Sequence, residues 1–158
     1  MIRPYKPSDL PALMDIGNRA WRPIYDMYER CRGYELARLL VPDRGTAKSD
    51  QIRAFAEHSP ERLVICEEGG RVVGFLTFSL DREKGIGTIG NNAVDPECGL
   101  KGMGQQMYRA VLERFRQEGM RFAKVTTGLD EAHAPARRAY ERAGFNLRQE
   151  DVTYYMKL

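Results

Sequence analysis

Hydrophobic positions in the first half of the chain change between helical and extended spacing, which predicts a strand, helices and a hairpin. A short strand is expected at residues 2–5, and a helix capped by Ser8 or Asp9 follows it up to about residue 21. Residues 21–60 are harder to interpret: an aromatic, mixed-charge segment precedes a loop and a short helix. Residues 62–80 are typical of two strands joined by a Gly-Gly turn.

The second half of the chain alternates more regularly between strands and helices. In order, its spacing predicts a strand at 88–94, a helix up to about 118, a strand at 122–129, a helix at 134–144 and two closing strands within 145–158. A glycine stands at the end of each of the two helices, where a left-handed backbone commonly terminates a helix. This order predicts one α/β domain, residues 1–158, with a mixed sheet.

Composition excludes several classes of protein. The chain has 25 basic and 22 acidic residues, and this net charge of +3 does not indicate a nucleic-acid partner. Three cysteines and two histidines stand at no metal-ligand spacing, so we expect no metal site and a reduced, cytoplasmic protein. The N-terminus lacks the apolar core of a signal peptide, and no apolar run approaches the roughly 20 residues that span a bilayer, so no membrane partner is expected.

Two glycine motifs compete as ligand-binding loops. The GxGxxG pattern at residues 85–90 precedes a strand, whereas a dinucleotide site must open a helix, so we interpret it as a hairpin turn. The stretch "GLKGMG" at residues 99–104 does stand between a strand and a helix, although it lacks the Lys-Ser/Thr ending of a P-loop. Free N–H groups and the helix dipole favour an anion there, most often a phosphate. The alternative is a plain glycine-rich turn.

Two motifs resemble those of the GNAT superfamily of N-acetyltransferases. The first, a strand ending V-x-P and a [QR]xxGx[GA] loop, aligns with Val94, Pro96, Gly102 and Gly104. The second, Nxx[AS]xxLYxxxGF, aligns with Ala136, Tyr140, Gly144 and Phe145. One helix and one strand separate the motifs, as in that superfamily. The resemblance covers about residues 62–158 well, and the N-terminal third only in its order of strand and helix.

Three positions depart from the superfamily's motifs. Gly99 stands where Gln or Arg is usual, and Leu100 where Gly is common. Because such a loop contacts pyrophosphate through backbone N–H groups, these changes affect loop shape more than binding chemistry. His133 stands where Asn is usual, and it can still donate one hydrogen bond to pantetheine or phosphate.

The resemblance implies the acyl-CoA N-acyltransferase fold, a mixed and mostly antiparallel sheet flanked by helices. It also implies that the strand ending at Val94 splays from the strand at 122–129, and that acetyl-CoA is the acyl-donor cosubstrate, without a metal. The residues expected to contact acetyl-CoA are Ala93, Val94, Gly99, Leu100, Lys101, Gly102, Met103, Gly104, Gln105, His133 and Tyr140.

The chemistry of acyl transfer assigns roles to two of these residues. A backbone N–H near Val94 is the expected oxyanion donor, and Tyr140 occupies by motif the position of the acid that protonates the departing thiolate. The alternative for Tyr140 is a core tyrosine packed at helical spacing. The base stays open: Asn91 and Asn92 occupy the strand positions where many relatives carry a carboxylate. Either water removes the proton, or one of Glu67, His58 and Glu97 does.

The amine acceptor is expected between the aromatic segment that starts at Trp21 and the closing strands. Asn91 and Asn92 alternate faces, so one of them should face the cleft, and Asn92 is our candidate. Trp21, Tyr25, Tyr28, Tyr34, Tyr154 and Tyr155 could line an aromatic wall. Asp26 or Glu29 could attract a cationic amine. The alternative is an amphipathic helix with buried aromatic residues and a solvated charged face.

The sequence therefore predicts an N-acetyltransferase that acts on a primary amine of a small molecule or peptide. The alternative is a catalytically silent acyl-CoA-binding sensor, which the missing strand carboxylate and His133 would suit. A homodimer formed through the closing strands is compatible with the resemblance. The identity of the acceptor does not follow from the fold.

Overall fold

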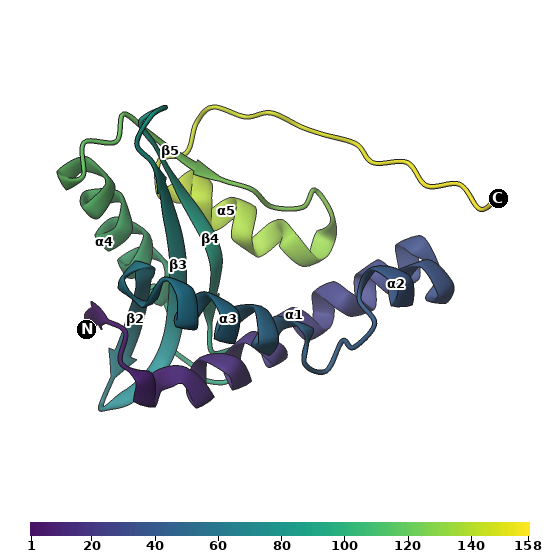
Figure 1. The fold of residues 1–158 in the computed structure, drawn as a ribbon, viewed down its shortest axis with the longest axis horizontal. Helices are drawn as coiled ribbons and strands as arrows, with labels where there is room; N and C mark the ends of the chain where they lie inside the picture. Colours follow the sequence, from purple (N-terminus) through teal and green to yellow (C-terminus); the bar gives the residue numbers. More distant parts are fainter.

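The computed structural model describes all 158 residues and contains one five-stranded sheet in the order β1-β2-β3-β4-β5 (Figure 1). Neighbouring strands are antiparallel except β4 and β5, which are parallel. The strands are β1 (Ile2–Pro4), β2 (Leu63–Glu68), β3 (Arg71–Asp81), β4 (Ile86–Val94) and β5 (Phe122–Val125). This arrangement confirms the mixed, mostly antiparallel sheet that the sequence predicts.

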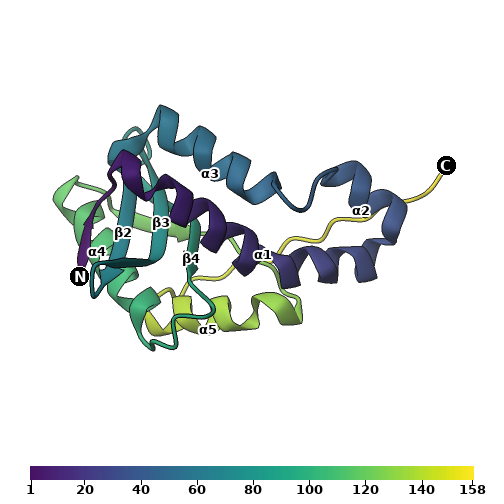
Figure 2. The same cartoon turned by 90° about the horizontal axis from the view of Figure 1, so that it is seen from below.

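Helices cover both faces of the sheet (Figure 2). They are α1 (Leu10–Arg32), α2 (Tyr34–Leu40), α3 (Ala47–His58), α4 (Met103–Gln117) and α5 (Ala134–Arg142), with short 3₁₀ turns η1 (Pro7–Asp9), η2 (Pro60–Arg62) and η3 (Glu131–His133). Helices α1 and α3 pack on one face around a core that includes Leu13, Ile52 and Phe75. Helices α4 and α5 pack on the other, around Met107, Val111 and other residues. The sheet therefore separates two cores, and β4 contributes side chains to both.

Glycine positions explain why several elements end where the sequence predicts. Gly69 and Gly70 have φ values of 56° and 77° and form the two-residue turn between β2 and β3. Gly119 has φ 76° just after α4, which begins at Met103 as expected. Gly85, the first glycine of the GxGxxG pattern, lies in the turn before β4. That pattern is thus part of a hairpin and opens no helix.

The N-terminal third contains more helix than expected. Helix α1 continues past residue 21 to Arg32, although Pro23 lies inside it. Proline lacks an N–H donor and usually ends a helix, so it concealed this extension in the sequence. Helix α2 then projects away from the sheet, and α3 returns to pack beside α1 (Figure 2).

The prediction of two closing strands is wrong in this structure. Residues 145–158 form no strand and extend from α5 toward α2 (Figure 1). The tail contacts this end of the molecule through an ion pair between Lys157 and Glu35, 2.7 Å long, and through Arg32, which lies over the Tyr155 ring. A strand exists only when a neighbour completes its hydrogen-bond ladder, and alternating residues alone cannot supply that neighbour.

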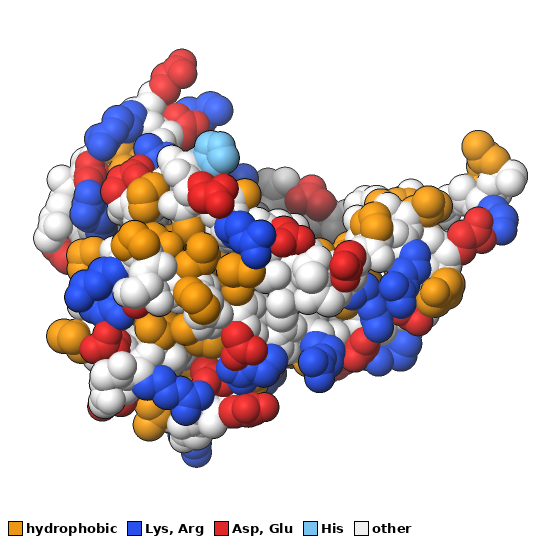
Figure 3. Space-filling view, turned by 60° about the horizontal axis from the view of Figure 1, so that its bottom comes forward, with side chains coloured by type: hydrophobic (Ala, Val, Ile, Leu, Met, Phe, Trp, Pro, Cys, Tyr) orange, Lys and Arg blue, Asp and Glu red, His pale blue; other side chains and the backbone are white.

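Surface charge and helix composition bear on possible partners. Basic and acidic side chains alternate over the face shown in Figure 3 and do not gather into one basic stripe. None of the helices combines the length and the apolar character needed to cross a bilayer.

Candidate active site

Strands β4 and β5 part halfway along β4. Their parallel pairing runs from Ile86 opposite Phe122 to Ile89 opposite Val125 and then stops, while β4 stays paired with β3 up to Val94. The Asp95 N–H donates to Val73 of β3 at 2.8 Å, and successive backbone groups of a strand point to opposite sides. The Val94 N–H consequently points away from β3, into the gap where β5 is missing. The splayed strands that the resemblance implies are present.

A bulge in β4 accompanies this separation. Leu76 pairs with Asn92 and Phe78 with Ile89, so β4 advances 92 − 89 = 3 residues while β3 advances 78 − 76 = 2. The extra residue falls at Gly90–Asn91, where a Cβ on Gly90 would meet the Thr77 hydroxyl at 2.6 Å. Bulges increase strand twist and redirect side chains, and they are common near active sites. The bulge thus determines where Asn91 and Asn92 point.

Helix α4 begins with an open, uncapped N-terminus beside the gap. Its N-cap, Gly102, has φ 84° and provides no side-chain cap, so the first-turn N–H groups have no partner within the helix. A Cβ at Gly99 or Gly102 would contact no atom within 4 Å, so this loop borders open space. The side chain of Gln105 donates to Ala139 of α5 at 2.7 Å, which leaves only its backbone N–H for a ligand. The local geometry suits a bound oxyanion.

Asn92 links two tyrosine hydroxyl groups on the side of β4 that faces α4 and α5. Tyr108 donates to Asn92 Oδ1 at 2.9 Å, and Asn92 Nδ2 donates to the Tyr140 oxygen at 3.1 Å. The Tyr140 proton has only a long, 3.5 Å contact with Asn92 Oδ1. Burial raises the pKa of Tyr140 above its ordinary value of 10, so the phenol stays protonated near neutral pH. Tyr140 is therefore a neutral phenol whose hydroxyl hydrogen has no close acceptor.

Asn91 faces the opposite side of β4 and contacts a lysine that the sequence did not single out. Lys48 of α3 is 6% exposed, and its Nζ donates to Asn91 Oδ1 at 3.0 Å and to Gln51 at 2.7 Å. It also lies 4.2 Å from the centre of the Trp21 ring. Burial lowers the pKa of Lys48 to about 8. No spacing in the sequence indicates this residue, because Lys48 lies in a segment that reads as a loop.

Asp95 fixes the end of β4 and is a second residue that sequence reasoning missed. Its carboxylate is buried and accepts from Arg19 Nη1 of α1 at 2.6 Å, from Arg71 of β3 and from the Glu97 N–H at 2.9 Å. The Arg19 hydrogen bond holds the pKa of Asp95 below its ordinary value. The loop that leads to α4 is therefore attached both to α1 and to the sheet.

The candidate bases lie away from the asparagine pair. Glu67 bonds Arg3 at 2.6 Å near the N-terminus, and the His58 Nδ1 lies 2.7 Å from its own helix at the Ala54 carbonyl. Glu97 is exposed in the loop after β4, 3.5 Å from Arg19. The side-chain partners of Asn91 and Asn92 are lysine and tyrosines, and none is a carboxylate.

His133 and the aromatic residues lie partly where expected. His133 caps α5, and its Nδ1 lies 2.7 Å from Asp130, which leaves Nε2 for other contacts. Trp21 and Tyr25 lie together on α1, and the ring centroids of Tyr25 and Tyr28 are 6.5 Å apart. Tyr34 and the tail tyrosines border a cavity beside α2. Asp26 and Glu29 both pair with Arg44, at 3.2 and 2.7 Å, so each already has a cationic partner in the chain.

Comparison with known proteins agrees with this geometry. S-(2-succino)cysteine N-acetyltransferase of Bacillus subtilis (strain 168) is 26% identical over 137 residues, which make up 80% of this chain and 83% of that protein. A GNAT family acetyltransferase of Brucella melitensis, solved with acetyl-CoA, has a TM-score of 0.62 at 23% identity and covers 98% of this chain and 95% of its own. PaiA N-acetyltransferase of Thermoplasma acidophilum, solved with coenzyme A, has a TM-score of 0.70 at 14% identity over 96% and 92% of the two chains.

A family description also matches the chain. Residues 21–145 match the Acetyltransferase (GNAT) family, a span that includes the parted strands, the α4 N-terminus and Tyr140. The match covers well over half of the chain and contains both motifs around which the site is built. This chain belongs to the GNAT family of acetyltransferases.

Proposed function

We propose that this GNAT N-acetyltransferase moves the acetyl group of acetyl-CoA to a primary amine of a small molecule or peptide by direct attack, with Tyr140 as general acid. The single observation that carries the proposal is the Tyr140 hydroxyl group. Asn92 positions it beside the edge where β4 parts from β5, and its hydrogen has no close acceptor. The Bacillus subtilis relative is named as an N-acetyltransferase of S-(2-succino)cysteine, and this supports a small-molecule acceptor.

The residues around the gap suit acetyl-CoA. Free N–H groups from Leu100 to Gln105 would hold its diphosphate, with the exposed Lys101 as an added cation. Unpaired backbone groups of Val94 border the gap where an amide-bearing arm can complete the ladder, whereas Ala93 is paired with Phe75 of β3. Met103 is 9% exposed, so it contributes its N–H while its side chain packs in the core. Acetyl-CoA supplies an activated thioester to this site.

Two groups of the chain act on the reacting atoms. The Val94 N–H donates to the carbonyl oxygen as negative charge grows there, and one such donor is typically worth about 2.7 to 4 kcal/mol. Tyr140 then gives its proton to the departing sulfur, and general acids of this kind contribute about 10² to 10⁴-fold. Because no carboxylate contacts Asn91 or Asn92, the proton of the attacking amine leaves to water in this proposal.

An amine-panel assay that detects released CoA thiol tests the reaction, alongside calorimetric titration with acetyl-CoA. We expect saturable acetyl-CoA binding and turnover of at least one primary amine. Stoichiometric binding without transfer to any amine would instead favour the acyl-CoA sensor. Absence of binding, under conditions where a known relative responds, would overturn both readings.

A further inference from the structure

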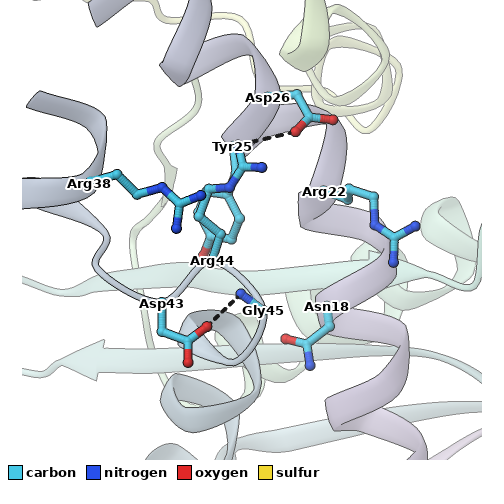
Figure 4. Close-up of a pocket in the computed structure, with 8 residues that line it drawn as sticks. All are labelled: Asn18, Arg22, Tyr25, Asp26, Arg38, Asp43, Arg44 and Gly45. Carbon is cyan, nitrogen blue, oxygen red and sulfur yellow. Dashed lines mark hydrogen bonds and ion pairs between the residues drawn. The ribbon is translucent and has the colours of Figure 1, made fainter. Parts of the chain in front are cut away.

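A cavity of about 350 Å³ lies between α1, α2 and the loop that precedes α3 (Figure 4). It is lined by Asn18, Arg22, Tyr25, Asp26, Arg38, Asp43, Arg44 and Gly45. Figure 4 shows the Arg38 side chain of α2 directed toward Arg44, and Arg22 of α1 on the opposite side with its guanidinium group turned away from them. The volume is at the small end of the range for ligand pockets, and only one lining residue is hydrophobic.

Two arginines of the cavity have no ion-pair partner. Arg44, by contrast, pairs with both Asp26 and Glu29. Arg22 and Arg38 make no hydrogen bond or ion pair with any residue, and Arg38 Nε is buried without a hydrogen-bond partner. A buried donor left unpaired costs free energy that a suitable acceptor would recover. Guanidinium groups bind planar carboxylates with two parallel hydrogen bonds, so the missing partner is an oxyanion.

The same helices connect this cavity to β4. Asn18 accepts from the Ser49 N–H at 3.1 Å, and the preceding residue, Lys48, reaches Asn91 of β4 at 3.0 Å. Lys48 bonds only neutral oxygens, so a further uncompensated cation lies between the cavity and the strand. Trp21, over whose ring Lys48 lies, directly precedes Arg22 in α1. The cavity is therefore connected to β4 through Asn18, Ser49 and Lys48.

We propose that the cavity binds a carboxylate of the acceptor, so that the amine acetylated by this enzyme belongs to a molecule that also carries a carboxylate. The inference rests on the proposed function, because it assigns the acceptor of that same site. Arg22 and Arg38 hold the carboxylate. A phosphate dianion fits less well, since Asp26 and Asp43 also border the cavity and would repel the second charge.

This arrangement also helps the reaction in the absence of a base. Positive charge near an ammonium group lowers its pKa and favours the neutral amine, which is the form that attacks. Lys48 and the two free arginines place such charge on the acceptor side of β4. An acceptor anchored by its carboxylate thus presents more deprotonated amine than it would in water.

A binding experiment tests this inference without turnover. Trp21 is the single tryptophan of the chain, and its intrinsic fluorescence reports events beside Arg22. We expect a saturable change when the protein is titrated with L-glutamate or β-alanine, and a weaker response to L-glutamine or β-alaninamide. Arg38→Gln and Arg22→Gln should each raise the dissociation constant of the carboxylate compounds about tenfold. Arg30→Gln is the matched control, because Arg30 is exposed on α1 and lies outside the cavity.

Kinetics then connects binding to transfer. For each pair of amines, kcat/KM should be at least about tenfold higher for the compound with the carboxylate than for its carboxamide. Arg22→Gln should raise the KM for the carboxylate compound with little change in kcat. Arg22 is exposed, so its replacement does not endanger the core if Arg38→Gln fails to fold. Equal binding of carboxylate and carboxamide, or variants that bind like the wild type, would overturn the inference. Carboxylate binding without any acetyl transfer would leave it standing and remove the proposed function.

Discussion

Two neighbouring asparagines of β4 face two different chemical environments. Asn92 points to the side of α4 and α5, where it joins the hydroxyl groups of Tyr108 and Tyr140 in a buried, uncharged cluster. Asn91 points to the side of α1 and α3, where its partner is the ammonium of Lys48. Beyond Lys48 lies the cavity with its unpaired arginines. One strand thus separates a neutral hydrogen-bonding side from a charged side.

The difference indicates a division of labour between a fixed and a variable task. Neutral donors and free backbone N–H groups suit a cofactor and a reaction that stay the same throughout a family. In our proposal, charged side chains on α1, α2 and α3 discriminate between acceptors, because charge complementarity contributes more to specificity than to the chemical step. On this proposal, acetyl transfer takes place on one side of β4 and the acceptor is recognised on the other.

Replacing Tyr140, on the uncharged side of β4, should have the largest effect on activity. Tyr140→Phe removes the proposed acid, and we expect kcat to fall about 100-fold, or ~2.7 kcal/mol, with the KM for acetyl-CoA nearly unchanged. Steady-state kinetics with the best amine of the panel measures this change. Tyr154→Phe, in the exposed tail, is the control and should behave like the wild type. A Tyr140→Phe enzyme within threefold of wild-type kcat would remove the acid from the mechanism.

Replacing Asp95 should destabilise the end of β4, where its carboxylate binds arginines of α1 and β3. Asp95→Asn leaves Arg71 without a counter-charge and removes the buried partner of Arg19, which keeps only the more exposed Asp15 and Glu97. We expect a loss of about 2 kcal/mol in the free energy of unfolding, measured with urea. The lowered pKa of Asp95 means that its contribution is present above the ordinary value of 3.8 and disappears as the pH falls through the lower folded value. Stability of the variant should therefore decline less steeply in acid.

The exposed Asp50, which makes no ion pair, provides the control for this measurement. Asp50→Asn should change neither the free energy of unfolding nor its acid dependence. Equal stability of the Asp95 and Asp50 variants would show that the buried pairs contribute nothing.

Replacing Gly102 should weaken the proposed binding of acetyl-CoA. Its φ of 84° costs a residue with a side chain about 1 to 2 kcal/mol, so Gly102→Ala should lower stability by about 1 kcal/mol and acetyl-CoA affinity about fivefold. Gly119→Ala is matched, because Gly119 has φ 76° at the other end of α4 and likewise has free space around its Cβ. Calorimetry should find that the control loses stability but keeps its affinity. Equal affinities in the two variants would separate the loop from cofactor binding.

Replacing Lys48 should give the smallest effect, on the charged side. Since burial lowers the pKa of Lys48 to about 8 from 10.5, the unfolded chain binds more protons between these values, and stability rises with pH across this window. Lys48→Met should remove this part of the rise, as seen by urea unfolding at pH 7.5, 9 and 10.5. Lys124→Met, on an exposed residue, should keep the wild-type slope. Identical slopes in all three proteins would contradict a shifted Lys48.

Local sequence patterns were sufficient for elements whose spacing and end residues are visible in the sequence. Helix α4 has apolar residues at helical spacing and a glycine at each end, and β2–β3 has its turn in two glycines, so both were predicted nearly to the residue. The glycine loop before α4 and Tyr140 stand in motifs of fixed spacing, and their roles stay predictions. The helix expected up to about residue 21 is longer in the structure, because α1 accommodates Pro23 and continues to Arg32.

Long-range partners were beyond local reasoning. Lys48 meets Asn91 across 43 residues, and Arg19 meets Asp95 across 76, and neither pair leaves a periodic trace in the sequence. The tail has an alternating pattern typical of strands, yet it joins no sheet, because a strand depends on a neighbouring strand and the fold places none beside the tail.

The sequence by itself determined the order of strands and helices from β2 to α5, the glycine loop before α4 and the acetyltransferase family, since these depend on residues close together along the chain. Only the tertiary structure decided where β4 parts from β5, which asparagine faces which side, and that arginines of α1 and α2 meet around one cavity. Those outcomes depend on contacts between distant segments, whose geometry is set by the packing of two cores against a twisted sheet.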